Sequence, residues 1–308
     1  MEAMRLLFAS LAVAAGGCFN TASSGNQGHA DFSWQDCLLG CPLDQHSMAA
    51  GGARAGITAT VHQGEPAIGS VASSNPSVAT FARGQNPSDV VATAGQPGSA
   101  DLILVDGNGN QIDRATVTVK PTTTLAFDHG WPDNGPPPNV LAGAVDELHT
   151  TTMNGSEVLV GTGAVKFTPT TNVKPGGGIV FGDSFSFVGD PGMGTIDADC
   201  VDAHIAVLFN FLPSTAITSV SASMQSITFS HSAKGDVDIT VQAGAVPLFD
   251  AECAWTMMPA AGLTASRIQG GIAGGPVSRW QLSGQVGNYT AVCTVPGGKS
   301  VTLSITVD

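Results

Sequence analysis

The feature that most constrains the fold is a two-residue alternation of apolar and polar side chains in short stretches of the sequence. It is clearest in residues 71–81, "VASSNPSVATF", and again in residues 89–119. Successive residues of a strand face opposite sides of a sheet, so this pattern indicates half-buried strands. The helical period of 3.6 residues is almost absent after the first twenty residues. The sequence therefore predicts an all-β protein.

One pair of predicted strands is joined by a recognisable turn. Residues 100–105 and 111–119 flank "DGNGN", whose Asn and Gly residues readily adopt positive φ, and together they predict a β-hairpin. The turn also has oxygen-bearing side chains at alternate positions, as calcium loops do. Such loops need Gly at the sixth position and an acidic ligand at the twelfth, where Gln111 and Val117 stand here. The hairpin explains the same residues, and no metal or other cofactor is predicted.

Charge excludes one class of partner. The chain has 308 residues, of which 43% are hydrophobic, enough for packed cores. Only 11 residues are Lys or Arg, against 24 Asp and Glu, which gives a net charge of −13. No basic patch is available to neutralise phosphates, so nucleic acid is not an expected partner.

The first residues have the features of an export signal. In "MEAMRLLFASLAVAAGGCFN", Arg5 precedes an apolar run over residues 6–15, too short to span a bilayer, which is followed by small residues. The Gly-Gly-Cys ending resembles the lipobox of bacterial lipoproteins, although Ala15 stands where that family usually has Leu. The resemblance implies a signal peptide over residues 1–17 and a lipid on Cys18 that anchors the chain to the membrane of the bacterial cell envelope, at the outer membrane. The alternative is an ordinary secretion signal cut near Ala15.

The rest of the chain divides by composition. Residues 18–36 are rich in Ser, Gly and Asn, and we predict that they form a flexible tether without a core. "KPTTT" and "FLPSTAITSVSAS" contain Pro at the ends of strand-like stretches and indicate two boundaries. We therefore expect three β-sandwich units, over residues 37–120, 121–212 and 213–308.

Two stretches of the first unit carry a family resemblance. "SSNPSVATF" and "DGNGNQIDRATVTV" resemble the bacterial Ig-like domains that are repeated in surface and envelope proteins. The resemblance covers residues 37–120, and residues 139–161 are similar to the second strand of such a domain. It implies tandem Ig-like β-sandwiches and a non-catalytic role in binding, adhesion or spacing, with an unidentified protein or glycan as ligand.

The cysteines predict disulfides, because an exported chain meets an oxidising compartment. Cys253 and Cys293 lie in the last unit and form the most credible bridge. Cys37 and Cys41, in "CLLGC", either form a small loop disulfide or one of them pairs with Cys200. Neither a second Cys-x-x-Cys nor a His pair with ligand spacing stands near this set, which disfavours zinc.

The last unit can be compared with Ig-type sandwiches, in which an inter-sheet disulfide packs on a buried Trp and a Tyr precedes the second Cys. Here Trp255 follows Cys253, and Tyr289 precedes Cys293. The 40-residue spacing of the cysteines and the position of the Tyr differ from antibody domains, which favours a bridge between other strands.

Residues 179–190, "IVFGDSFSFVGD", resemble the nucleophile block of GDS(L)-type serine esterases, which would make Ser184 a nucleophile. That family also needs a late Asp-x-x-His for its base, and the chain has none. The near-alternation of Ile179, Phe181, Phe185 and Phe187 indicates a strand instead. We predict no catalytic residue and a protein that is not an enzyme. A small envelope esterase using Ser184 and a purely structural spacer are the alternatives.

A possible ligand contact lies in "DHGWPDNGPPPN". Trp131 is flanked there by His129 and Asp133, and an exposed aromatic side chain beside Pro and Asn can stack on a sugar ring or anchor a protein partner. The simpler alternative is that Trp131 covers the end of its own sandwich.

Overall fold

The computed structural model describes residues 22–35, 41–128, 136–177, 183–249, 251–269 and 275–308. Within these ranges the regular structure consists of β-strands and two 3-10 turns, η1 (Leu43–Gln45) and η2 (Ser214–Ala216). The predicted all-β class is confirmed. None of the helical segments described is long and apolar enough to cross a membrane.

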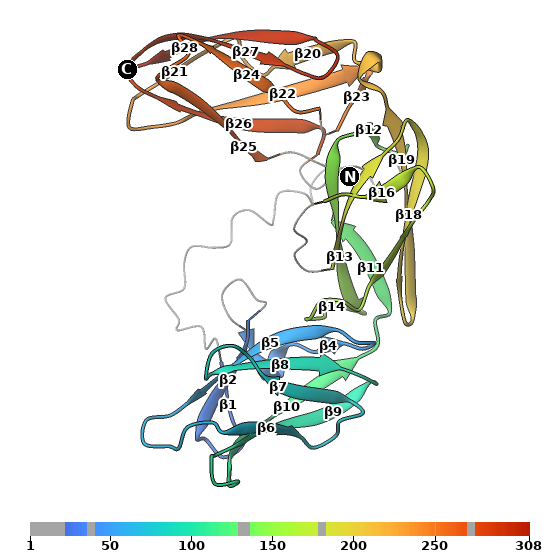
Figure 1. Ribbon diagram of the computed structural model, residues 1–308, viewed down its shortest axis with the longest axis vertical. Helices are drawn as coiled ribbons and strands as arrows, with labels where there is room; N and C mark the ends of the chain where they lie inside the picture. The colour runs from blue at the N-terminus through green and yellow to red at the C-terminus, as the bar shows by residue number, and fades with distance from the viewer. Residues whose placement is uncertain (1–21, 36–40, 129–135, 178–182, 250, 270–274) are drawn as a thin grey trace. The chain divides into compact units, whose positions relative to one another are not determined.

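The chain forms two compact units, one built largely from residues before 119 and the other largely from residues 119–308 (Figure 1). The first unit contains one β-sandwich. One of its sheets has, in spatial order, β1 (Ser23–Ser24), β2 (Ala30–Trp34), β5 (Arg54–Val61), β8 (Asp89–Ala94) and β7 (Ala79–Arg83), with β3 (Cys41–Pro42) paired to β2. The other sheet has β4 (Met48–Ala49), β10 (Gln111–Lys120), β9 (Gly98–Val105) and β6 (Ser70–Ser73).

The second unit contains two further sandwiches, the middle and the last. One sheet of the middle sandwich has, in spatial order, β11 (Thr124–Asp128), β13 (Val145–Asn154), β17 (Ser184–Gly189) and β16 (Val173–Pro175), with β14 (Glu157–Val158) paired to β13. Its other sheet has β12 (Asn139–Leu141), β19 (Ala203–Leu212), β18 (Gly192–Cys200) and β15 (Lys166–Pro169). One sheet of the last sandwich has, in spatial order, β20 (Ser219–Ala222), β22 (Gly235–Ala243), β26 (Val277–Gly284) and β25 (Leu263–Gln269), with β23 (Val246–Pro247) paired to β22. Its other sheet has β21 (Ser226–Phe229), β28 (Ser300–Val307), β27 (Gly287–Thr294) and β24 (Ala254–Met258).

The same strand order recurs in all three sandwiches. The main strands of each sandwich can be lettered A to G in chain order, with the first strand split into A and A′. One sheet then has the order A-B-E-D and the other A′-G-F-C. In the last sandwich these are β20, β22, β26 and β25 in one sheet, and β21, β28, β27 and β24 in the other. A′ runs parallel to G in each case. This is the Ig-like arrangement of two sheets around a shared core.

The sequence alternation appears in the structure as alternating burial. On β9, Ala100, Leu102 and Leu104 are buried, while the residues between them are partly exposed. The core of the middle sandwich is aromatic, with the rings of Phe187 and Phe209 5.2 Å apart. The strands therefore form because their apolar faces can be buried between two sheets.

The prediction of a flexible tether over residues 18–36 is corrected by the structure. β1 and β2 lie inside residues 18–36, and β2 pairs antiparallel with β5. Ala30, Phe32 and Trp34 are at most 1% exposed, so this segment supplies core residues and is part of the first sandwich. The Ser, Gly and Asn residues that precede β2 gave the segment its tether-like composition. The predicted signal peptide and Cys18 lie outside the described residues.

A buried carboxylate holds this N-terminal segment in place. Asp113, on β10, is 0% exposed and accepts hydrogen bonds from the backbone N–H groups of Gln27, His29, Ala30 and Arg114, at 2.7–2.9 Å. Burial alone would raise the pKa of Asp113, but these hydrogen bonds outweigh it and hold the pKa below its usual value. The loop before β2 is thus tied to a strand more than eighty residues away.

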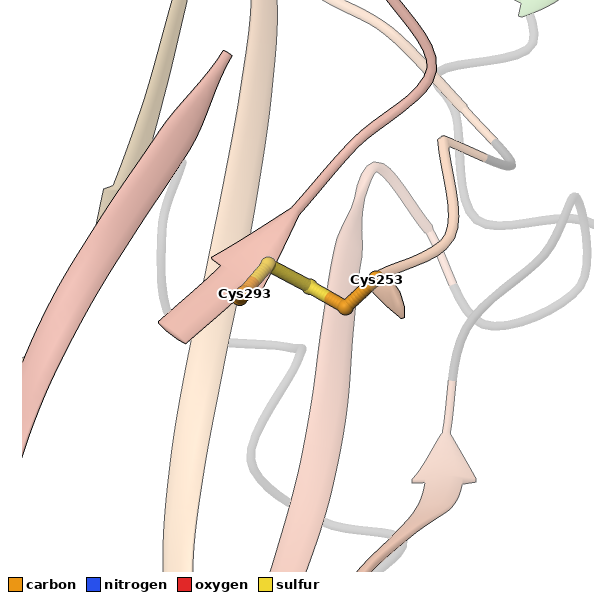
Figure 2. The surroundings of a disulfide bond; sticks show 2 residues. All are labelled: Cys253 and Cys293. Carbon is orange, nitrogen blue, oxygen red and sulfur yellow. A yellow bond between two sulfur atoms is a disulfide. The ribbon is translucent and has the colours of Figure 1, made fainter. Parts of the chain in front are cut away.

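Cys253 and Cys293 form a disulfide in the last sandwich, with Cα atoms 5.1 Å apart (Figure 2). Cys253 directly precedes β24 and Cys293 lies on β27, and these two strands are neighbours in one sheet, with Trp255 opposite Cys293. The bridge therefore joins the C and F strands, whereas the antibody bridge joins two sheets. Tyr289 makes the other Ig-like contact: its hydroxyl donates to the carbonyl of Gln285, 2.9 Å away at the E–F corner.

The remaining cysteines are partly described. Cys200 carries a free thiol, so the pairing of Cys200 with Cys37 or Cys41 is not the arrangement found. Cys41 is disulfide-bonded. Cys37 lies outside the described residues.

Candidate functional site

The titratable groups around Ser184 gather on the outer face of the middle sandwich. Ser184 is the first residue of β17, in agreement with the predicted strand position. Phe187 on the same strand is in the core, so alternation places Ser184 and Ser186 on the opposite face. Both serines are nevertheless at most 8% exposed. Buried hydroxyls on an outer sheet face need polar partners.

Ser184 finds its partner on the adjacent strand β13. Its Oγ donates to Oε1 of Glu147 at 2.7 Å, and the other carboxylate oxygen of Glu147 is 3.8 Å from Nε2 of His149. In the strand register His149 lies directly opposite Ser184. We name these three residues the Ser184 cluster.

Asp183 lies next to the cluster. Burial raises the pKa of Asp183, although its carboxylate accepts hydrogen bonds from the backbone N–H groups of Gly163 and Val165. Its carbonyl oxygen accepts from the backbone and the hydroxyl of Thr150. All of these contacts tie the start of β17 to its neighbours, which is a structural task.

The order of groups in the Ser184 cluster decides its chemistry. A serine nucleophile is activated when a histidine ring takes the hydroxyl proton and a carboxylate orients that histidine. Here Ser184 donates its hydroxyl proton to the carboxylate of Glu147, at 2.7 Å, and His149 is 3.8 Å from the other oxygen of that carboxylate. Because carboxylates are weak bases near neutral pH, this hydrogen bond stabilises the strand pair and does not generate an alkoxide.

The calcium-like loop is explained by its own hydrogen bonds. Both oxygens of Asp106 accept hydrogen bonds, from the backbone N–H groups of Asn108 and Asn110 and the side-chain amide of Asn110, at 2.8–3.1 Å. The hydrogen bonds from Asn110 are the main reason that the pKa of Asp106 lies below its usual value. Gly109 has a φ of 89°, as the turn requires. The loop is a hairpin turn between β9 and β10, as predicted.

Metal-ligating residues are not grouped in the part of the chain that the structure describes: it contains no set of three or more His, Cys, Asp and Glu side chains placed to hold an ion. His204 lies between two carboxylates on the β18–β19 hairpin, with Nδ1 2.8 Å from Asp199 and Nε2 3.8 Å from Asp197. These side chains are exposed, and such surface pairs contribute little.

The predicted ligand contacts His129, Trp131 and Asp133 lie outside the described residues. The neighbouring described strands place that segment in the connection between β11 and β12 of the middle sandwich. A second feature, which the sequence does not indicate, is an open crevice of about 590 Å³ within the second unit. It is lined by Leu141, Ala142, Gly143, Ala144, Val145, Ser214, Glu252 and Pro296.

Sequence reasoning also missed Glu147 and His149. Their two-residue spacing on a predicted strand places both on one face, which is a signal that was available. The crevice had no such signal, because its lining comes from four separate segments spread between Leu141 and Pro296.

No protein-family model matches the chain, and no curated protein is similar to it in sequence. Solved structures do match, at low scores. The crystal structure of the S-layer protein rSbsC(31-844) is 10% identical and covers 85% of this chain, with a TM-score of 0.27. The D00-D0 domain of intimin is 9% identical and covers 59% of this chain and 96% of its own, with a TM-score of 0.22.

The Yersinia pseudotuberculosis adhesin InvE is 10% identical and covers 60% of this chain and 58% of its own, with a TM-score of 0.24. The chain spans about half of the length of the S-layer structure, 54%. At these identities and scores the matches do not indicate what this chain binds.

Proposed function

We propose that this chain is a non-catalytic module of the bacterial cell envelope, anchored by a lipid on Cys18, whose Ig-like sandwiches serve in binding, adhesion or spacing. The observation that carries the proposal is the recurrence of one strand order in three sandwiches. Repetition of a sandwich adds surface and reach without adding a reaction centre, and function then resides in surface sites.

The chemistry of the Ser184 cluster supports a non-catalytic role. Its serine is buried and donates its hydroxyl proton to the carboxylate of Glu147. A hydrolase would need an accessible hydroxyl with a base within hydrogen-bond reach. The alternative of a serine esterase is therefore not favoured by the geometry.

The proposed anchor has a consequence for the placement of the first sandwich. If Cys18 is the mature N-terminus, only the four residues 19–22 separate it from β1, which begins at Ser23. A fully extended chain of that length spans roughly 15 Å. The first sandwich would then be held close to the membrane surface.

Trp131, His129 and Asp133 remain our candidates for contact with a protein or glycan ligand. Indole rings bury a large apolar area and offer one N–H donor, a combination suited to stacking on a sugar or filling a pocket in a protein.

An esterase assay tests the non-catalytic claim. Purified protein is expected to hydrolyse p-nitrophenyl acetate and butyrate no faster than a buffer blank, and Ser184→Ala is expected to behave identically. Ser186→Ala is the matched control, because it removes a second buried hydroxyl from the same strand. Hydrolysis that disappears in Ser184→Ala and persists in Ser186→Ala would overturn the proposal, whereas hydrolysis unchanged in both variants would identify a contaminant.

A further inference from the structure

Two pairs of adjacent residues in the second unit are divided between its two hydrophobic cores. Val140 is buried in the core of the middle sandwich, whereas the next residue, Leu141, is buried in the core of the last sandwich. Leu248 is buried in the core of the last sandwich, whereas the next residue, Phe249, is buried in the core of the middle one. Each sandwich thus places one large apolar side chain in the core of the other.

The backbone explains this exchange. Successive side chains of an extended segment point in opposite directions, so a segment that passes between two cores can supply both. Val140 and Phe249 form a parallel β-bridge. The N–H of Leu141 donates to the carbonyl of Phe249 at 3.1 Å, and the N–H of Phe249 donates to the carbonyl of Asn139 at 2.8 Å. Phe249 therefore extends the β12 edge of the middle sandwich.

The connection between the sandwiches is short and is also packed. β19 ends at Leu212 and β20 begins at Ser219. Between them Ile217 is buried in the core of the last sandwich, and Leu212 and Ala144 pack against that same core. Domains on a short linker swing against one another unless the interface between them is large and hydrophobic. Here swinging would expose Leu141 and Phe249 to water and break both backbone hydrogen bonds.

We propose that the exchange of Leu141 and Phe249 locks the middle and last sandwiches into one rigid element. The crevice beside the lock, which Leu141 helps to line, then keeps one shape rather than opening and closing. This inference concerns the mechanics of the second unit and is independent of the proposed anchoring and of the identity of any ligand.

Pulsed electron paramagnetic resonance on the full chain tests the lock. In the background of Cys18→Ser, which removes a further thiol, one spin label is attached to the free thiol of Cys200 in the middle sandwich. A second is attached to Val286→Cys, at an exposed position of the last sandwich. The otherwise unaltered chain is expected to give a single narrow distance distribution. The double variant Leu141→Ala/Phe249→Ala is expected to lose that single narrow distance and give a broad distribution.

The control separates loss of the lock from general destabilisation. Phe229→Ala removes a buried phenylalanine from the core of the last sandwich that does not cross to the middle one, and it is expected to keep the narrow distribution. A broad distribution in the unaltered chain, or a narrow one in the double variant, would overturn the proposal. If the double variant does not fold by circular dichroism, Phe249→Ala alone takes its place, with the same broadening expected and a narrow distribution again decisive against the lock.

Discussion

Replacing Asp113 by alanine is expected to lower the free energy of unfolding of the first sandwich by about 3 to 5 kcal/mol, because it leaves several buried N–H groups without an acceptor. The carboxylate is fully buried and accepts four backbone hydrogen bonds, three of them from the segment before and at the start of β2. Loss of these bonds is expected to release residues 22–34 first, since the other hydrogen bond described between that loop and β10 is a single one, from the N–H of Asn26 to the carbonyl of Arg114.

The same carboxylate predicts a pH dependence with a definite sign. The pKa of Asp113 is lower in the folded chain than its ordinary value, so ionised Asp113 favours folding. Its contribution is fully present above the unfolded pKa, about 3.9, and is lost as the pH falls through the folded pKa. Asp113→Asn is expected to remove this part of the acid sensitivity of the first sandwich, because its side chain does not titrate.

Hydrogen exchange followed by mass spectrometry measures both effects in the intact chain, since peptides report on each sandwich separately. Asp113→Ala is expected to speed exchange in residues 22–118 and to leave residues 219–307 unchanged. Asp31→Ala is the matched control: Asp31 lies on β2, but its carboxylate is exposed and pairs only with His62 among the contacts described, and such a surface pair contributes little to stability. Equal effects of the two variants would contradict the account.

Loss of the Cys253–Cys293 bridge is the second large effect. The double variant Cys253→Ser/Cys293→Ser is expected to lower the free energy of unfolding of the last sandwich by roughly 3 to 4 kcal/mol, because a cross-link that closes a loop of this length restricts the unfolded chain. The cysteines are 40 residues apart in sequence, and they join neighbouring strands near the buried side chain of Trp280.

Urea unfolding measured by tryptophan fluorescence in a Trp34→Phe/Trp131→Phe background gives this difference, because the remaining Trp255 and Trp280 are both in the last sandwich, with ring centroids 5.7 Å apart. Cys200→Ser is the control, since it removes a free thiol and is expected to change the free energy by less than about 0.5 kcal/mol. A double variant that unfolds at the same urea concentration as Cys200→Ser would show that the bridge does not stabilise the sandwich.

Local features of the fold could be predicted because their signals are local. The hairpin around "DGNGN" needed only alternation on both sides and turn-forming residues between, and β9 and β10 end and begin where that pattern indicates. Ser184 was placed on a strand by the alternation of its phenylalanine neighbours, which outweighed the resemblance to an esterase.

The start of the first sandwich could have been predicted but was not. Ala30, Phe32 and Trp34 alternate with polar residues, and this two-residue alternation indicates a half-buried strand. The Ser- and Gly-rich composition of the preceding residues favoured a tether instead. What completes the strand is Asp113, whose partners are 83 to 86 residues away in sequence. No pattern in the sequence pairs these residues.

The remaining features could not be predicted, because they depend on how strands that are far apart in the sequence align with one another. The Cys253–Cys293 pairing followed from counting cysteines in one unit, but its place within a single sheet depends on how β24 aligns with β27. Glu147 reaches Ser184 for the same reason, through the register of β13 and β17. The exchange of Leu141 and Phe249 requires two sandwiches to be in contact, which alternation within one strand does not encode.

Protease accessibility on intact and lysed cells, for the unaltered chain and for Cys18→Ser, tests the central claim most directly. The account predicts that the unaltered chain remains with the membrane fraction, whereas Cys18→Ser is released as a soluble protein. Cleavage on intact cells would place the sandwiches on the cell surface, and cleavage only after lysis would place them in the periplasm. Cys200→Ser controls for loss of a thiol elsewhere and is expected to behave as the unaltered chain. Retention of Cys18→Ser in the membrane fraction would contradict the lipid anchor.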